Sequence, residues 1–195
     1  MKAILTKSQK TKKILFDCAL ELFREKGYDN VSVSEIVKKA QTAKGTFYIY
    51  FDSKAKIITE LFEKYDDYYD EVYENMDKTL PAKDRLMIII KESLSFTSEK
   101  IGYDLINVLY QSQLSLVTKA TNAERSLYRI VTELVEEGQK NGQFTNELSS
   151  NEITKMIVRN IRGTFYDWCL QRGGFDIVAD GCEYMKTFLN GITIG

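Results

Sequence analysis

A single proline, Pro81, interrupts the 195-residue chain. Proline removes a backbone hydrogen-bond donor and breaks helix interiors, so its near absence leaves long stretches free to form helices. Along these stretches apolar residues recur at spacings of three and four, which is the period of an amphipathic helix and not the alternation of a strand. The sequence therefore predicts an all-α protein.

Three helices are expected in the first fifty or so residues. The first has an apolar stripe and ends at Gly27, a residue type that favours the end of a helix. Ser32 and Glu35 have the spacing of a capping box, so the second helix is expected to start just after Ser32. It breaks across residues 41–43, and a third, short helix follows over residues 44–51.

About six helices are expected in the rest of the chain. Asp52 or Ser53 can cap a helix that runs through about residue 77. After Pro81, residues 86–90 are apolar on all sides, which is typical of a helix surrounded by other helices. Further capping and glycine signals predict helices over about 102–118, 122–140 behind Thr121, 150–171 behind Ser149, and 176–192.

The charge differs between the two parts of the chain. Residues 1–54 hold 11 Lys and Arg and 6 Asp and Glu, a net charge of +5, whereas the remainder has a net charge of −6. A basic head on an acidic body indicates that only the head meets a polyanion. We accordingly expect a small DNA-binding domain over residues 1–53 and a second helical domain over residues 54–195.

Composition argues against several other classes of protein. The chain has no histidine, and its three cysteines, Cys18, Cys169 and Cys182, are far apart. These features remove the commonest general base and the usual zinc-site spacings. No apolar run has the length of a signal peptide or a membrane span. We expect no enzyme activity, no metal, no cofactor and no membrane segment, and a cytoplasmic location.

The two short helices around residues 41–43 have the pattern of a helix-turn-helix, whose second helix enters the major groove of DNA. Polar and aromatic side chains on that second helix can reach phosphates and base edges. Gly45 lets the DNA backbone approach closely, and residues at the neighbouring helix starts can clamp phosphates on either side. The expected DNA-binding residues are Ser32, Lys44, Gly45, Thr46, Tyr48, Tyr50 and Lys54. Phe47 and Phe51 are assigned to the core instead.

Residues 11–62 resemble the DNA-binding head of the tetracycline-repressor (TetR) family. The resemblance is carried by Ala19, Leu22, Phe23, Gly27, Tyr28, Val33, Ile36, Ala40, Lys44, Gly45, Thr46, Tyr48, Phe51, Lys54 and Leu61. It implies an all-helical dimer in which the head binds operator DNA and the body binds a small effector that releases it. Two positions depart from the family pattern: Gln41 stands where glycine is usual in the turn, and Ala43 where serine is common.

The body resembles the family at residues 137–144 and 162–168, and such proteins pair their last two long helices into a four-helix bundle. We expect a homodimer through the corresponding helices. Two apolar stripes were assigned to this interface, with Gly163 and Gly181 allowing close approach. The stripes are Ile153, Ile157, Ile161 and Phe165 on one helix, and Val178, Cys182, Met185, Leu189 and Ile192 on the other.

Amphipathic aromatic residues suit an apolar cavity with few polar anchors. The expected effector-binding residues are Phe62, Tyr65, Tyr69, Phe96, Tyr110, Phe165 and Trp168. For each of them ordinary packing is the alternative. Arg159 or Arg162 could anchor an anion, although exposed or salt-bridged arginines are commoner. The acidic run from Asp66 to Asp77 is most simply a solvated helix face.

The sequence thus favours a ligand-responsive transcriptional regulator, in particular a repressor that binds a near-palindromic operator as a dimer. Two other functions stay open. One is a helical ligand-binding or enzymatic protein that keeps a vestigial DNA-binding head, and the other is an interaction module whose head binds another protein. Dependence of binding on salt separates them, because only phosphate neutralisation gives a steep fall in affinity with added salt.

Overall fold

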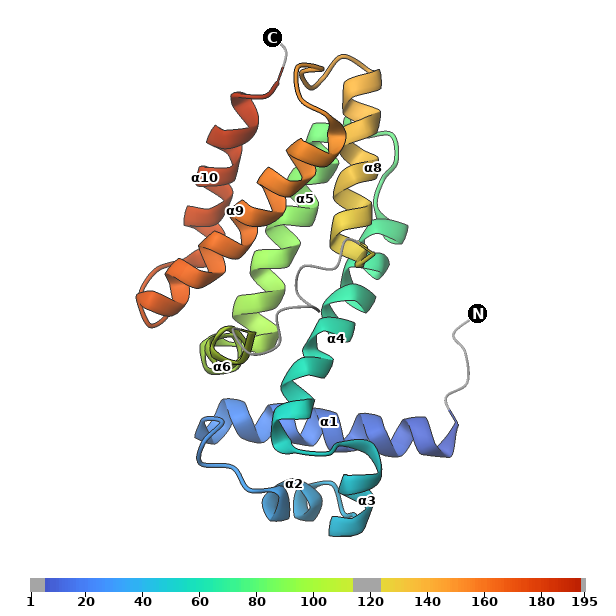
Figure 1. Ribbon diagram of the computed structural model, residues 1–195, viewed down its shortest axis with the longest axis vertical. Coiled ribbons are helices and arrows are strands. Elements are labelled where there is room, and N and C mark those ends of the chain that lie inside the picture. Colours follow the sequence, from blue (N-terminus) through green and yellow to red (C-terminus); the bar gives the residue numbers. More distant parts are fainter. Residues whose placement is uncertain (1–5, 114–123, 194–195) are drawn as a thin grey trace.

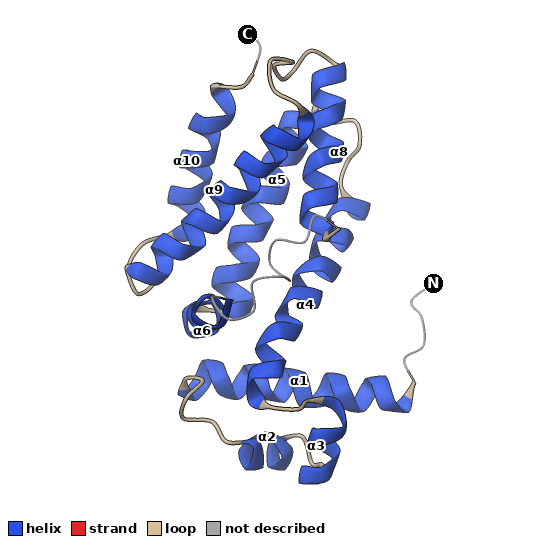
Figure 2. Ribbon diagram, in the orientation of Figure 1, coloured by secondary structure: helices blue, strands red, loops and turns tan. Residues whose placement is uncertain are grey.

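The computed structural model describes residues 6–113 and 124–193. Within these ranges every regular element is a helix, and the β-type pairing is limited to one bridge between Phe144 and Thr193 (Figure 2). This confirms the all-α prediction. The elements are α1 (Lys7–Lys26), α2 (Val33–Lys39), α3 (Lys44–Tyr50), α4 (Lys54–Asn75), α5 (Ala82–Ser95), the π-helix η1 (Phe96–Ile101), α6 (Tyr103–Gln113), α8 (Ser126–Lys140), α9 (Ser150–Leu170) and α10 (Ile177–Asn190).

Helices α1, α2 and α3 form a separate head below the other helices (Figure 1). Both short helices pack against α1, and the small core between them includes the fully buried side chains of Phe23, Ile36, Phe47 and Phe51. The assignment of Phe47 and Phe51 to the core is confirmed. This core fixes the orientation of α3, because the two phenylalanines hold its inner face.

The turn between α2 and α3 is left-handed at Gln41, where φ is 53°. A residue with a Cβ pays about 1–2 kcal/mol for this conformation, which glycine adopts freely. The turn is closed by hydrogen bonds from the Gln41 amide to the Lys38 carbonyl (3.2 Å) and from the Thr42 amide to the Val37 carbonyl (2.9 Å). The helix-turn-helix geometry is therefore formed with glutamine in place of the family's usual glycine.

Helix α4 leaves the head and runs along the body (Figure 1). Ser53 caps it, since its side chain accepts a hydrogen bond from the Lys56 amide. In its first turn the Lys54 ammonium donates to the carbonyls of Tyr28 (2.5 Å) and Val31 (2.9 Å). The start of α4 is thereby attached to the loop that precedes α2.

In the body, α5 contacts α4, α8, α9 and α10. Leu86, Ile89 and Ile90 of α5 are fully buried, as the apolar run predicts for a helix surrounded by others. The π-helix η1 follows α5 directly, and Gly102 with φ of 83° starts the turn into α6. Helix α6 then lies between the body and α1.

The acidic side of α4 is not simply a solvated face, so that expectation is wrong for two of its residues. Asp66 pairs with Arg125, and Asp70 pairs with Arg129 of α8 (2.7 Å). The Ser126 hydroxyl also donates to Asp70 (2.9 Å). These carboxylates attach α8 to α4, which the spacing of acids in α4 alone could not show.

Most of the apolar residues expected at the dimer interface lie inside the protomer, whereas Val178 and Cys182 are half-buried. Ile153, Ile157 and Ile161 are buried, as are Met185 and Leu189. Gly181 allows a close approach to Leu94 of α5, since a Cβ there would lie 2.7 Å from the leucine side chain. The reason is that α9 and α10 must first cover α5, and the apolar stripe is the face that does so.

Other boundaries agree with the capping signals where these are described. Ser149 and Glu152 form the expected capping box at the start of α9, and Asp176 caps α10. The expected cap at Thr121 and the end of the helix after residue 113 lie outside the described residues. Among the described residues, no helix is long and apolar enough to cross a membrane.

The capping box of α2 predicts a pH dependence of stability. The Glu35 carboxylate accepts hydrogen bonds from the Lys26 ammonium and from the amide and hydroxyl of Ser32. These contacts lower the pKa of Glu35 to about 2 from a usual value of 4.5. Because the folded state has the lower pKa, the stabilisation is present above about pH 4.5 and is lost as the pH falls toward 2.

We expect Glu35→Gln to lower the thermal unfolding midpoint at pH 7 and to differ less from the unmodified protein as the pH falls toward 2. The measurement is a series of melting curves by circular dichroism over that pH range. A difference between the two proteins that stays constant with pH would contradict the assigned cause.

Candidate nucleic-acid interface and internal cavity

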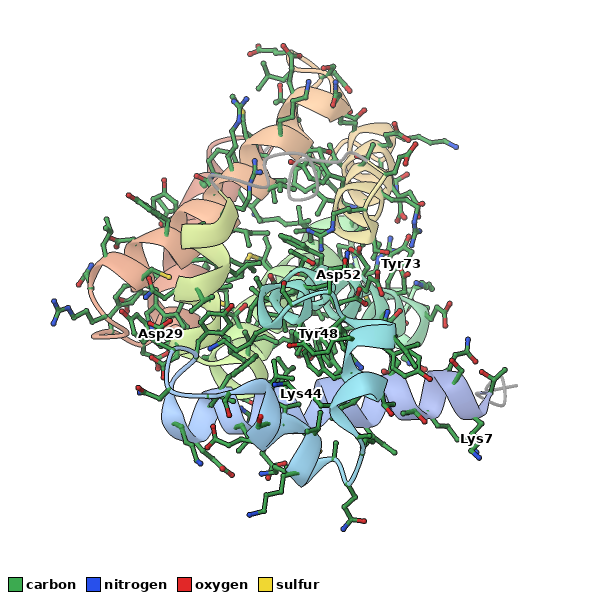
Figure 3. All side chains as sticks on the ribbon, turned by 60° about the horizontal axis from the view of Figure 1, so that its bottom comes forward. Lys7, Asp29, Lys44, Tyr48, Asp52 and Tyr73 are labelled. Carbon is green, nitrogen blue, oxygen red and sulfur yellow. The ribbon has the colours of Figure 1, made fainter. Side chains whose placement is uncertain are left out.

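The outer face of α3 lies at the end of the molecule farthest from the body. In Figure 3, which brings this end forward, Lys44 and Tyr48 are labelled on it. Lys44 and Gly45 are exposed, and a Cβ on Gly45 would have nothing within 4 Å. The Tyr48 side chain is 50% exposed, and Thr46 is half-buried.

The other predicted DNA-binding residues are exposed or half-buried but already hydrogen-bonded within the head. The Ser32 hydroxyl belongs to the capping box of α2, and the Tyr50 hydroxyl lies 3.1 Å from the Ser8 hydroxyl of α1. Two of the three Lys54 ammonium hydrogens are used on backbone carbonyls. The structure therefore groups Lys44, Gly45 and Tyr48 as exposed residues, and gives Ser32, Tyr50 and Lys54 positions that also stabilise the head.

Ile49 is the residue that sequence reasoning missed on this face. Its side chain is 76% exposed, more than any other large apolar side chain described. It follows Tyr48 and precedes Tyr50 on α3, so it lies among polar residues with no apolar neighbour to cover it. The sequence contains a signal for this exposure. Phe47 and Phe51 belong to the inner face of α3, so Ile49, two residues from each, lies on the opposite face.

Three lysines of the head are paired with carboxylates. Lys26 pairs with Glu35, Lys39 with Glu21 and Glu25, and Lys12 with Glu60. Within residues 6–113 and 124–193, Lys44 makes no ion pair. Its ammonium group is therefore the cation of α3 available to a phosphate.

The shape of this end suits duplex DNA. A seven-residue helix is about 10 Å long and 10–12 Å wide with its side chains, and the major groove of B-DNA is about 12 Å wide. The helix protrudes at the end of the head and carries short polar and aromatic side chains on its outer face. This geometry can place side chains against base edges.

The body contains a partly open cavity of about 50 Å³ between α4, α6, α8 and α9. Its wall is mostly apolar and aromatic. The lining residues are Phe62, Tyr65, Tyr69, Ile106, Leu109, Tyr110, Arg125, Leu127, Tyr128, Val158, Ile161, Arg162 and Phe165.

Five of the seven predicted effector-binding residues lie in this wall: Phe62, Tyr65, Tyr69, Tyr110 and Phe165. The other two lie outside it. Phe96 stacks on Tyr68, with ring centroids 4.3 Å apart. Trp168 packs edge-on against Tyr103, and its indole N–H donates to the Phe175 carbonyl (3.1 Å). Aromatic composition could not separate these two from the lining residues, because the separation depends on how α6 packs on α9.

The tyrosine hydroxyls of α4 are satisfied by neighbouring elements. Tyr65 shares a hydrogen bond with Thr97 of η1 (2.7 Å), and Tyr69 shares one with Ser93 of α5 (2.7 Å). Burial raises the pKa of Tyr65, and it raises that of Tyr69 to about 12, so both stay neutral. Their aromatic rings are what they contribute to the cavity wall.

Two guanidinium groups also line the cavity. Arg162 was considered from the sequence, and it lies in the wall, whereas Arg159 is exposed. Arg125 was missed because nothing in its local pattern distinguishes it from a surface arginine. The aliphatic residues Ile106 and Leu109 have helical spacing on α6, which could have indicated their shared face.

Among the described residues, no group of three His, Cys, Asp or Glu side chains could hold a metal ion. The cavity wall contains apolar side chains, hydroxyls and two cations. Its chemistry therefore suits an amphipathic organic molecule with an apolar part and an anionic part.

Comparison with protein families gives two matches that together cover most of the chain. Residues 15–61 match the model of bacterial regulatory proteins of the tetR family. Residues 61–191 match the model of the C-terminal region of YsiA-like proteins. The first match spans the head and the first turns of α4, and the second spans the body.

Similar proteins and solved structures agree with these matches. The chain is 28% identical to the fatty acid metabolism regulator protein of Bacillus subtilis, over 91% of this chain and 93% of that protein. The fatty acid degradation regulator FadR from Bacillus halodurans has a TM-score of 0.76 and 22% identity, over 97% of this chain and 98% of that one. FadR from Bacillus subtilis in complex with stearoyl-CoA has a TM-score of 0.68 and 24% identity, over 92% of this chain and 98% of that one.

The family matches cover the exposed helix-turn-helix and the helical body that encloses the cavity. The same two parts are the ones that the sequence separates by charge. The chain belongs to the tetR family of bacterial transcriptional regulators, with a YsiA-like C-terminal region.

Proposed function

We propose that this regulator is a repressor that binds its operator through α3 and is released by a long-chain acyl effector, such as an acyl-CoA, in the cavity of the body. One observation carries the proposal. Helix α4 lines the cavity with Phe62, Tyr65 and Tyr69, and its first turn is bonded to the head through Lys54. The two sites therefore share one helix.

On DNA, Lys44 is proposed to bind a phosphate, while Thr46 and Tyr48 reach base edges or the backbone. Gly45 allows the sugar-phosphate backbone to come close. Ser32 and Lys54 flank α3 and Tyr50 ends it, and all three are proposed to contact phosphates with the hydrogens and lone pairs that the head leaves unused. Such contacts fix the position of the protein on the duplex, and the base contacts specify the sequence.

The dimer is proposed to form through the outer faces of α9 and α10. Exposed apolar side chains gather on these helices, namely Met156, Tyr166, Leu170 and Tyr184. Gly163 of α9 has open space around it, which would allow a partner helix to approach closely. A two-fold dimer presents two copies of α3, so a near-palindromic operator with half-sites about 34–36 Å apart fits this arrangement.

The effector class is supported by the wall of the cavity and by the relatives. An acyl chain is apolar, as most of the wall is, and the anionic groups of an acyl-CoA or a fatty acid suit the two arginines. The similar protein from Bacillus subtilis is a fatty acid metabolism regulator, and the FadR structure from that organism contains stearoyl-CoA.

The small volume of the cavity couples effector binding to the position of α3. Pockets for small organic ligands have volumes of about 300–1,000 Å³, far more than the roughly 50 Å³ present. An effector can therefore enter only as α4, α6, α8 and α9 separate. Because α4 is bonded to the head, this separation changes the position of α3, and the effector favours the conformation that does not fit the operator.

The first test is operator binding. We expect the purified protein to bind its own upstream intergenic DNA with an affinity that falls steeply with salt, and to saturate at two protomers per site or a multiple. Lys44→Gln should weaken binding and reduce the slope of log K against log salt by about 1, because one phosphate contact is lost. The measurement is fluorescence anisotropy at several salt concentrations.

The matched control is Lys140→Gln, at the far end of α8 from the head. It should leave both affinity and slope unchanged. Equal binding to the upstream DNA and to a scrambled duplex of the same length would contradict sequence-specific recognition.

The exposed side chain of Ile49 leads to a second prediction for the DNA-binding face of α3. An exposed branched side chain beside base edges is complementary to the methyl group of thymine, which projects into the major groove. We expect one thymine in each half-site at which replacement by deoxyuridine, which lacks only that methyl, weakens binding about 3–10-fold.

In Ile49→Ala this sensitivity to deoxyuridine should disappear at the same position and at no other. Affinity for the unmodified operator would fall by a similar factor. If the loss of binding free energy caused by Ile49→Ala and the loss caused by deoxyuridine were additive, Ile49 would not touch that methyl group.

The effector is tested by release from the operator. We expect stearoyl-CoA to raise the apparent Kd for the operator at least about tenfold, a coupling within the usual range of 1–3 kcal/mol, whereas CoA without an acyl chain has no effect. Val158→Phe, which fills the cavity wall, should keep operator binding and lose the response. Melting curves check that this variant folds, and a full response in it would place the effector elsewhere.

A further inference from the structure

We infer that Arg125 is the residue that binds the anionic group of the effector, and that Asp66 holds this arginine until the effector arrives. The inference rests on the proposed function and names a binding residue and a competitor within the same site. Neither residue stands out in its local sequence pattern.

Arg125 directly precedes α8 and lines the cavity, yet its side chain bonds to α4. Its Nε donates to an Asp66 carboxylate oxygen (3.2 Å), and its Nη2 donates to the Phe62 carbonyl (3.1 Å). The guanidinium also lies 4.6 Å from the centre of the Phe62 ring. The arginine side chain is only 16% exposed, so its charge is largely removed from water.

The pair with Arg125 satisfies only part of the Asp66 carboxylate. One of its carboxylate oxygens pairs with Arg125, while the other, Oδ1, is buried and has no hydrogen-bond partner among the described residues. An unpaired buried acceptor carries a desolvation cost. The pair is therefore a weaker arrangement than a carboxylate with both oxygens satisfied, and another anion can compete for the arginine.

Competition gives the effector a preference between two conformations. A carboxylate or phosphate that binds Arg125 from the cavity displaces Asp66 and places a second negative charge beside it. Repulsion between the two anions favours movement of Asp66, and with it α4, away from α8. A neutral apolar ligand would fill the cavity without this effect.

The neighbouring ion pair provides an internal comparison. One turn further along α4, Asp70 pairs with Arg129 of α8, a more exposed arginine that also pairs with Glu133, and neither Asp70 nor Arg129 lines the cavity. Loss of either pair weakens the contact between the two helices. Only loss of the Asp66 pair can change the affinity for an effector directly.

The test compares Asp66→Asn, Asp70→Asn, Arg125→Gln and Arg162→Gln with the unmodified protein. The probes are stearate, stearoyl-CoA and octadecan-1-ol, whose head groups are a carboxylate, a set of phosphates and a neutral hydroxyl. Dissociation constants are measured by equilibrium dialysis below the concentration at which the probes aggregate. Operator binding without probe and melting curves identify any variant that fails to fold.

We expect Arg125→Gln to weaken binding of the anionic probes about 10–100-fold and of the alcohol less than about threefold. Asp66→Asn should tighten binding of the anionic probes about 3–10-fold, because the competitor is gone, while Asp70→Asn changes it less than about twofold. An effect confined to stearoyl-CoA would identify phosphate as the anion, and an effect on stearate would identify carboxylate.

Several results would overturn the inference. If Asp66→Asn and Asp70→Asn behaved alike, the pair would be merely structural. If only Arg162→Gln separated the anionic probes from the alcohol, the anion would bind at Arg162. Should the unmodified protein bind none of the three probes, the proposed acyl effector would be wrong, and the inference would fall with it; binding that no variant changes would overturn the inference alone.

Discussion

The structure depends on the continuity of α4. This helix has 22 residues and an uninterrupted hydrogen-bonded backbone, so it spans about 33 Å as one rigid element. Its first turn is bonded to the loop before α2, its middle lines the cavity, and its acidic side is paired with the start of α8. A rigid element with attachments at both ends cannot move at one of them without moving at the other. A displacement of α4 at the cavity wall therefore also acts on its attachment to the head.

A cavity of only about 50 Å³ makes the length of an apolar ligand important for binding. Separating packed helices costs free energy, because buried side chains lose contacts that the closed form provides. A ligand offsets this cost in proportion to the apolar surface that it buries, at about 0.8 kcal/mol for each methylene group. Short chains cannot offset the separation of four helices, whereas long ones can. Under the proposed function, the small volume at rest would therefore select against short acyl chains.

The sequence predicts those parts of the structure that depend on neighbours within a few residues. Capping at Ser32 and Ser149, the buried face of α3 and the surrounded helix α5 all follow from local spacing. The family resemblance extends this to the placement of the helix-turn-helix, with Gln41 in the left-handed turn position.

What the sequence does not predict depends on which helix packs against which. The apolar stripes of α9 and α10 have the pattern of an interface, but whether they face a partner or α5 is decided by the packing of the body. Asp66 and Arg125 lie 59 residues apart, and no local pattern joins them. In the same way, Phe96 and Trp168 have the composition of cavity residues but pack elsewhere, against Tyr68 and Tyr103.

The pairing of charges in the head bears on how strongly an effector must act. Several head lysines are neutralised by acids of the same chain, which leaves Lys44 as the unpaired cation on α3. Each further phosphate contact would strengthen binding to any DNA sequence alike. An effector can contribute only a coupling free energy of about 1–3 kcal/mol. If electrostatic attraction dominated the affinity, that coupling would leave the protein on DNA. The choice of site therefore has to come from the base contacts of α3, to which this helix adds a single cation, Lys44.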